Sequence, residues 1–194
     1  MSIVDRVRDQ VRSECHAAQN RFGVAFFGEH LEPVVGYALR LAEALGADRE
    51  VVELAGWLHD LAAIRDLAAV PTHAADGARL ARGILEAHGL PALAIDAVCR
   101  AIASHASPTA PAAASPEERC LWDADVLAQL SRPAYWLYYL YGIRGLGRAE
   151  GLAWLRARAA GAWSSLHEEA RRMGAAAQEE VLRLLGPEPG ALAP

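Results

Sequence analysis

The chain of 194 residues contains no lysine. A Schiff-base lysine and a Walker-type phosphate-binding loop both require one, so the enzyme classes that depend on them are excluded. Acidic residues outnumber basic ones by 24 to 19, and the formal net charge is −5. This charge argues against broad nucleic-acid binding through electrostatics alone.

Cysteine and long apolar runs are also scarce. The three cysteines, Cys15, Cys99 and Cys120, lie far apart and form no CxxC pair, which predicts reduced thiols rather than a disulfide framework. No apolar run approaches the roughly 20 residues that a membrane-spanning helix needs. The charged start, MSIVDRVRDQVRSE, is unlike a secretory signal. We therefore expect a cytoplasmic protein without a membrane segment.

Helical periodicity is what the sequence has in abundance. Apolar residues, 53% of the chain, recur at spacings of three and four residues through most of its length. The predicted helices cover residues 3–18, 31–45, 48–62, 74–88 and 91–104, a segment that begins near 116, and two further segments that reach about 185. Gly46 is the expected end of one helix and Asp48 the N-cap of the next. Ser115 and Glu118 are typical of a capping box.

The order of these segments predicts an all-α fold, with no repeat and no strand. We expect one helical domain over residues 1–186, in which 133–186 form a C-terminal extension, and a disordered tail over 187–194. The stretch ASPTAPAAASP, 106–116, is typical of a low-complexity loop. The aromatic run AYWLYYLYG, 134–142, is expected in the core or at a homodimer interface rather than as the wall of a substrate site. The Arg-rich faces of 148–172 are expected to be solvated.

Histidine and aspartate residues recur at or beside the predicted helix ends. They are His30, His59, Asp60, His73, His105 and Asp125. Helices 31–45 and 48–62 are joined by a short turn and should pack antiparallel, which places His30 and His59 at the same end of the hairpin. Imidazole and carboxylate ligands suit Mn, Fe, Zn, Co or Ni, whereas the lack of a thiolate cluster disfavours structural zinc. A bound cation would also offset the cost of placing Asp60 beside an apolar stripe.

Four motifs in this order resemble the HD domain, a helical metal-dependent phosphohydrolase superfamily. AGWLHDLA resembles the family's AALLHDI, THAADGARLARGILEAHGLP its H-x3-G-x2-A-x3-L segment, AIASH its I-x2-H segment, and CLWDADVLAQL the DAD-x-L helix of small bacterial members. The resemblance covers about residues 24–130. It implies an HD-type helical bundle, to which residues 133–186 add C-terminal helices.

The resemblance also implies a ligand set and a reaction. The pattern H…HD…D implies that His30, His59, Asp60 and Asp125 bind a metal ion, with Asp123 outside the ligand set. His73 and His105 occupy places where two-metal members add ligands, so one or two divalent ions are expected. The implied activity is hydrolysis of a small phosphorylated compound, with nucleotides among the candidates, by a metal-activated water, and Asp60 is the implied catalytic residue.

The chain departs from many HD domains at Ala63, where a Lys or Glu commonly serves phosphate binding or proton transfer. We expect Arg65, Arg144 or Arg148 to bind phosphate instead, because arginine suits bidentate phosphate contact. Two alternatives stay open. The same ligands could hold a di-iron centre that oxygenates a substrate, or the domain could be a non-catalytic ligand sensor or assembly scaffold.

Overall fold

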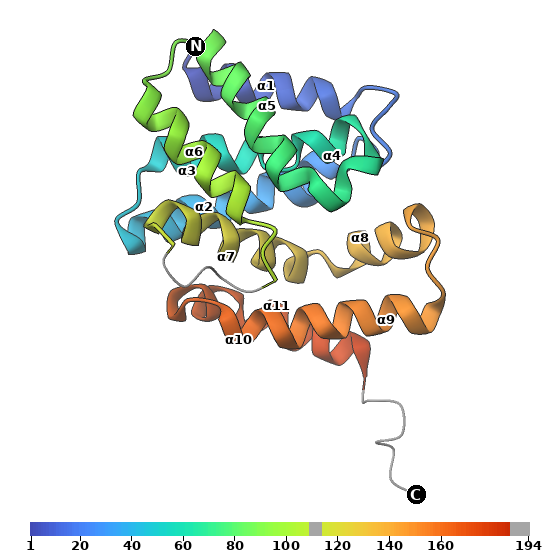
Figure 1. The fold of residues 1–194 in the computed structure, drawn as a ribbon. Coiled ribbons are helices and arrows are strands. Elements are labelled where there is room, and N and C mark those ends of the chain that lie inside the picture. The colour runs from blue at the N-terminus through green and yellow to red at the C-terminus, as the bar shows by residue number, and fades with distance from the viewer. Residues whose placement is uncertain (109–113, 187–194) are drawn as a thin grey trace, which may run out of the picture.

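The computed structural model describes residues 1–108 and 114–186 (Figure 1). Every regular element within these residues is a helix, which confirms the predicted all-α fold. No helix in these two segments has the length and apolar character needed to cross a membrane. The expected tail at 187–194 and the middle of the expected loop at 106–116 lie outside the described residues.

Five helical elements make up the N-terminal part of the chain, and the third and fourth of them form the predicted antiparallel hairpin. They are α1 (Ile3–Cys15), a short π-helix η1 (Phe27–Leu31), α2 (Glu32–Leu45), α3 (Arg49–Leu58) and α4 (Leu61–Arg65). Gly46 ends α2 with a left-handed φ of 69°, and the Asp48 carboxylate accepts hydrogen bonds from the first backbone N–H groups of α3. Both predicted caps are thus confirmed. Gly56 lets α2 and α3 approach closely, since a larger side chain there would meet Val35.

The predicted continuous helix over 48–62 is wrong at one point. The chain leaves the α-helix between Leu58 and Leu61, and Asp60 takes φ −102° and ψ 8°. This is close to the sparsely populated bridge region, where many active-site residues lie. The apolar periodicity hides the break because Leu58, Leu61 and Ile64 are all fully buried on either side of it.

A second hairpin lies against the first. A 3-10 turn, η2 (Leu67–Thr72), leads into α5 (His73–Ala87), which is paired with α6 (Ala92–Ser104). Gly89, with φ 74°, makes the turn between them. These bounds agree with the predicted helices to within one residue at each end.

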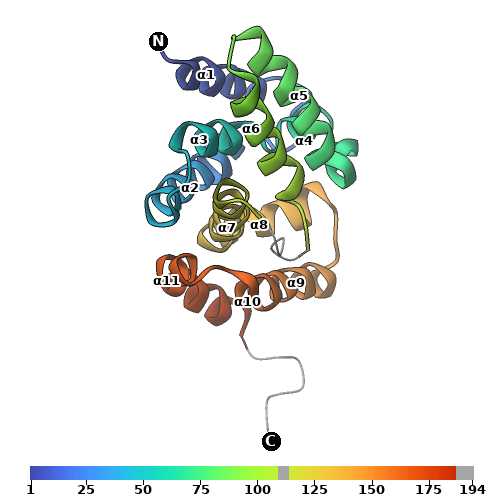
Figure 2. The ribbon, with the colours of Figure 1, turned by 60° about the vertical axis from the view of Figure 1, so that its left-hand side comes forward.

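Helix α7 (Pro116–Ser131) lies in the middle of the molecule. It begins at the predicted capping box, in which the Ser115 hydroxyl accepts from the Glu118 backbone N–H and the Glu118 carboxylate accepts from the Ser115 backbone N–H. Every residue from Cys120 to Leu130 is buried. A helix buried all round must be covered on all sides. Helices α2, α3 and α6 cover one side, and the C-terminal helices cover the other (Figure 2).

The C-terminal helices form this second covering layer. They are α8 (Pro133–Tyr138), the π-helix η3 (Tyr139–Ile143), α9 (Arg148–Ala157), the π-helix η4 (Arg158–Ala162), α10 (Trp163–Ser165) and α11 (Glu168–Leu185). Gly174 of α11 packs tightly on α7, where an added methyl group would overlap the Leu127 side chain. One cluster of buried hydrophobic side chains therefore runs from Val7 in α1 to Leu185 in α11.

Candidate metal centre

The structure brings the six residues predicted as ligands into one buried cluster. His30, at the end of η1, lies at its centre and is fully buried. Its Nε2 is 3.2 Å from Nε2 of His59, 3.3 Å from Oδ2 of Asp60 and 3.4 Å from Oδ1 of Asp125. Nε2 of His59 is also 3.3 Å from the same Asp60 oxygen. Nε2 of His30 thus lies within 3.4 Å of one donor atom from each of these three residues, and His30, His59 and Asp125 form one group that could hold a metal ion.

The two remaining histidines form a second group on the other oxygen of Asp60. Nε2 of His73 and Nε2 of His105 are 3.1 Å apart. They lie 3.4 Å and 3.8 Å from Oδ1 of Asp60, respectively. Asp60 therefore presents one carboxylate oxygen to each group of donors.

The tautomers of three histidines are fixed by the backbone. Each donates its Nδ1–H to the carbonyl three residues earlier: His59 to Gly56 at 2.8 Å, His73 to Val70 at 2.6 Å and His105 to Ile102 at 2.6 Å. A carbonyl oxygen can only accept, so Nδ1 carries the hydrogen and Nε2 of the neutral ring presents a lone pair. Fixing the ring through its other nitrogen is how proteins orient metal-binding histidines.

The donor set fits divalent metal ions. Two ligand atoms each about 2.1 Å from one ion lie about 3.0 to 3.4 Å apart when their angle is between 90° and tetrahedral. The distances between donors around His30, and the 3.1 Å between His73 and His105, fall in this interval. Each pair of facing Nε2 atoms can share at most one proton, which leaves a lone pair that a cation would satisfy.

The carboxylates carry the charge that such a cation requires. Burial disfavours the charged form of Asp60, but neighbouring His59 and the other surrounding histidines outweigh it and hold its pKa well below the usual value. Burial also opposes ionisation of Asp125, and His30 and then Arg158 lower its pKa below the usual value despite that. Both carboxylates are therefore ionised at neutral pH.

Two local features place the ligands. Asp60 turns inward because the chain breaks at the end of α3, and α5 lies against that break. A Cβ atom at Gly77 of α5 would come within 2.9 Å of the His59 carbonyl oxygen, so only glycine allows this approach. His73, one turn before Gly77 on α5, thereby reaches His105 and Asp60.

The two aspartates of the DAD motif face different partners. Asp125 faces the cluster, as the sequence predicts. Asp123 is fully buried on the opposite side of α7, where it accepts from Nε of Arg119 at 3.0 Å and from the backbone N–H of His167. Burial raises the pKa of Asp123 above its usual value. Asp123 therefore links α7 to the start of α11 through a hydrogen bond rather than facing the cluster.

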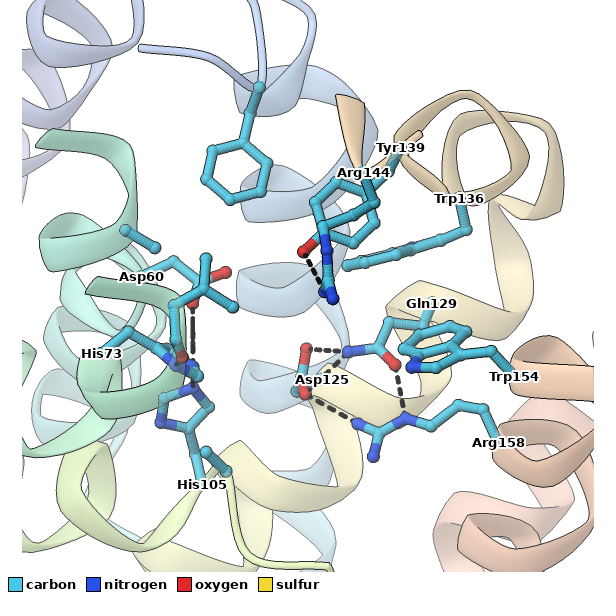
Figure 3. Close-up of a pocket in the computed structure, with 14 residues that line it drawn as sticks. Asp60, His73, His105, Asp125, Gln129, Trp136, Tyr139, Arg144, Trp154 and Arg158 are labelled. Atoms are coloured by element: carbon cyan, nitrogen blue, oxygen red, sulfur yellow. Dashed lines mark hydrogen bonds and ion pairs between the residues drawn. The ribbon is translucent and has the colours of Figure 1, made fainter. Parts of the chain in front are cut away.

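A cavity of about 240 Å³ opens beside the cluster (Figure 3). Asp60, His73 and His105 lie on one side of it in Figure 3, and Asp125 lies between them and the facing wall. The facing wall carries aromatic and polar side chains that belong to α7 and the C-terminal helices. They are Gln129, Trp136, Tyr139, Arg144, Trp154 and Arg158.

Of the three arginines predicted to bind phosphate, only Arg144 lines this cavity. Arg65 is turned toward α1, where its Nε donates to Oε1 of Glu14 at 3.0 Å. Arg148 begins α9 and borders a different hollow, with Leu184 and Leu185. Arg65 and Arg148 thus do not line the cluster's cavity, and the role predicted for them in phosphate binding stays a prediction that this geometry does not support.

Sequence reasoning missed Arg158 and Gln129. Arg158 was expected on a solvated face, but it lines the cavity, where Nη2 donates to Oδ2 of Asp125 at 3.1 Å. Gln129 stands one turn after Asp125 on α7, and that i,i+4 spacing was the available signal. The aromatic run is both core and wall: Tyr135, Trp136 and Tyr139 are buried, and the last two also line the cavity.

The comparisons with known proteins agree with this geometry. Residues 27–130, more than half of the chain, match the family model of the HD domain. No curated protein and no solved structure matches the chain. The matched segment includes all six residues of the cluster, and the expected resemblance is thereby confirmed. The chain belongs to the HD domain family.

Proposed function

We propose that this protein is a metal-dependent phosphohydrolase that acts on a small phosphorylated compound, with nucleotides among the candidate substrates. The observation that carries the proposal is the pair of donor groups, spaced for metal ions and joined by Asp60, beside a cavity that contains Arg144. HD domains are generally metal-dependent hydrolases, and the donor chemistry agrees with this.

The two donor groups would hold one ion each. His30, His59, Asp125 and Oδ2 of Asp60 would hold the first, and His73, His105 and Oδ1 of Asp60 the second. Nitrogen and oxygen ligands suit Mn, Fe, Zn, Co or Ni. When bound, such ions polarise phosphate oxygens and lower the pKa of a coordinated water. Asp60 would contribute one carboxylate oxygen to each ion, so we expect the reaction to depend most on this residue.

The chain's own residues would bind and orient the substrate from the facing wall. The Arg144 guanidinium offers charge and paired N–H donors to phosphate oxygens, and the buried rings of Trp136 and Tyr139 exclude water on that side. Ala63 also lines the cavity and supplies no proton-transfer group. We therefore propose that the aspartates and histidines of the cluster take part in proton transfer. The 240 Å³ cavity, below the roughly 300 Å³ of common ligand sites, favours a compact substrate.

The test is phosphate release from a panel of small phosphomonoesters, with Mn²⁺, Zn²⁺, Co²⁺ or Ni²⁺ added to metal-depleted protein. Asp60→Ala should abolish metal-dependent release, a loss of more than about 100-fold, because losing a ligand exceeds the 10- to 100-fold cost of losing its outer partner. Asp96→Asn is the matched control, since Asp96 is exposed on α6 and pairs with Arg82. A wild-type rate of phosphate release that changes neither with added metal nor with EDTA would contradict the proposal.

Metal content, oxygen consumption and melting temperature separate the two alternatives from the proposed hydrolase. Two irons per chain with oxygen consumption would favour a di-iron oxygenase, for which the six nitrogen and oxygen ligands are also suited. Cleavage of no phosphoester, together with a small molecule that raises the melting temperature, would favour a ligand sensor. Metal content of the wild type and of Asp60→Ala is therefore measured first.

A further inference from the structure

We propose that Arg158, in the C-terminal helices outside the family match, is a positioning residue that directs the Asp125 carboxylate toward His30. The inference rests on the metal centre of the proposed function. Arg158 begins the π-helix η4 and reaches across to α7, where Asp125 and Gln129 lie one turn apart.

The three side chains form a closed hydrogen-bonded triangle (Figure 3). Arg158 donates from Nη2 to Oδ2 of Asp125 at 3.1 Å and from Nε to Oε1 of Gln129. Gln129 in turn donates from Nε2 to both Asp125 oxygens, at 2.9 Å and 3.0 Å. Because Gln129 is equally close to the two oxygens, it does not distinguish them.

Arg158 makes the two carboxylate oxygens of Asp125 inequivalent, because it bonds only one of them. Its hydrogen bond occupies Oδ2, so Oδ1 is left to face Nε2 of His30 at 3.4 Å. The terminal torsion of an aspartate side chain is broad, and without this bond the carboxylate could rotate away from the ligand geometry. The planar fork of the arginine fixes both Gln129 and Asp125 in one geometry, whereas the rotatable donors of an ammonium group would hold them less rigidly.

The C-terminal layer holds Arg158 in place. Nε2 of Gln178, on α11, donates to the carbonyl of Ala159 at 2.8 Å, directly beside Arg158. Gly174, one turn earlier on α11, allows the tight contact with Leu127 of α7. Docking of α11 on α7 is thereby coupled to the orientation of a ligand, so the C-terminal helices contribute to the metal centre as well as to the core.

The test is calorimetric titration of the metal-depleted full chain with Mn²⁺. Arg158→Met keeps the length of the side chain and removes its donors, whereas Arg158→Lys keeps the charge. Asp125→Asn identifies the binding step to which Asp125 contributes. Arg171→Met is the matched control, because Arg171 lies in the same layer and donates to the carbonyl of Leu166, away from the cluster.

We expect Arg158→Met to weaken the step affected by Asp125→Asn by about 10- to 100-fold, the usual effect of losing an outer partner of a ligand. Any second step should be unchanged, Arg158→Lys should lie in between, and Arg171→Met should match the wild type. Melting temperatures of the metal-free variants verify folding. A merely structural role would weaken all steps alike, and this would overturn the inference.

Failure of the Arg158 inference can be distinguished from failure of the proposed function, because one is measured by Mn²⁺ affinity and the other by phosphate release. Mn²⁺ binding that depends on Arg158 without any phosphate release would uphold the positioning role and contradict the hydrolase. Metal-dependent phosphate release with the same Mn²⁺ affinity in Arg158→Met and wild type would do the reverse. A wild type that binds no Mn²⁺ would overturn both.

Discussion

The two walls of the cavity are built in different ways. On the ligand wall, His59, His73 and His105 are each oriented by a carbonyl only three residues away. On the facing wall, Arg158 is fixed by partners 29 and 33 residues away, and Tyr135, beside the wall, donates to the carbonyl of Phe22, 113 residues away. Local bonds orient the first wall, and tertiary packing orients the second.

The walls share one feature, which is the π-helical turn. The three π-helices of the described chain carry His30 (η1), Tyr139 (η3) and Arg158 (η4), and each of these residues belongs to the cluster or lines the cavity. Such turns are frequent at functional sites. One extra residue in a turn shifts the following side chains by about 100°, one step of an α-helix. That shift changes the face on which the residues after each π-helix lie.

The largest expected effect comes from breaking the ligand wall at Gly77. In Gly77→Val, the new side chain would meet the His59 carbonyl oxygen, which is backbone and cannot rotate away. Helix α5 must then move, and His73 with it, so metal-dependent phosphate release should fall by about 100-fold or more, as for the loss of a ligand. Steady-state assays and Mn²⁺ titration measure this.

The control for this variant lies on the same helix. Gly83 has open space around its Cα, so Gly83→Ala should leave activity unchanged and stabilise α5 by about 0.5 to 1 kcal/mol. Equal activity in Gly77→Val and Gly83→Ala would show that the close approach of α5 does not set the position of His73.

The contrast between the walls explains what the sequence could predict. The caps at Asp48 and Ser115 were confirmed because each depends on residues two or three positions away. The break before Asp60 was missed because the apolar pattern continues through it. Arg158 was missed because its inward placement depends on the packing of the C-terminal helices against α7, which no local pattern shows.

The six candidate ligands could be predicted because they belong to motifs that the sequence itself displays. The motifs place His30 and Asp125 in order along the chain, and the structure brings them to 3.4 Å. Their role as ligands stays a prediction until metal content is measured. The choice between Arg65, Arg144 and Arg148 required tertiary structure, because the positions of their guanidinium groups depend on how distant helices pack.

A smaller effect is expected at Arg144 on the facing wall. Arg144→Ala removes the guanidinium that we propose to bind the substrate phosphate, so KM should rise by about 10-fold, or 1.4 kcal/mol, with Mn²⁺ affinity unchanged. Arg148→Ala is the matched control and should leave both quantities unchanged, since Arg148 borders a different hollow. The reverse pattern, with a raised KM only in Arg148→Ala, would restore the sequence-based assignment.

The smallest effect is expected where the C-terminal layer meets α7. In Gly174→Ala, the new methyl group would overlap the Leu127 side chain and lie 3.2 Å from the Trp163 ring. Overpacking costs about 1 to 3 kcal/mol, and the higher helix propensity of alanine offsets about 1 kcal/mol of it. We therefore expect the free energy of unfolding to fall by about 1 kcal/mol in urea titrations.

Gly174→Ala also tests whether the docking of α11 on α7 affects Mn²⁺ binding at Asp125. If α11 holds Arg158 against Asp125, Gly174→Ala should weaken the Mn²⁺ step to which Asp125 contributes by a few-fold, less than Arg158→Met, because the triangle remains but its support has shifted. Gly161→Ala, in the same layer with open space around it, should leave Mn²⁺ binding unchanged and should not lower the free energy of unfolding. A loss of stability in Gly174→Ala with wild-type Mn²⁺ affinity would mean that α11 only covers α7 and that Arg158 keeps its place without it.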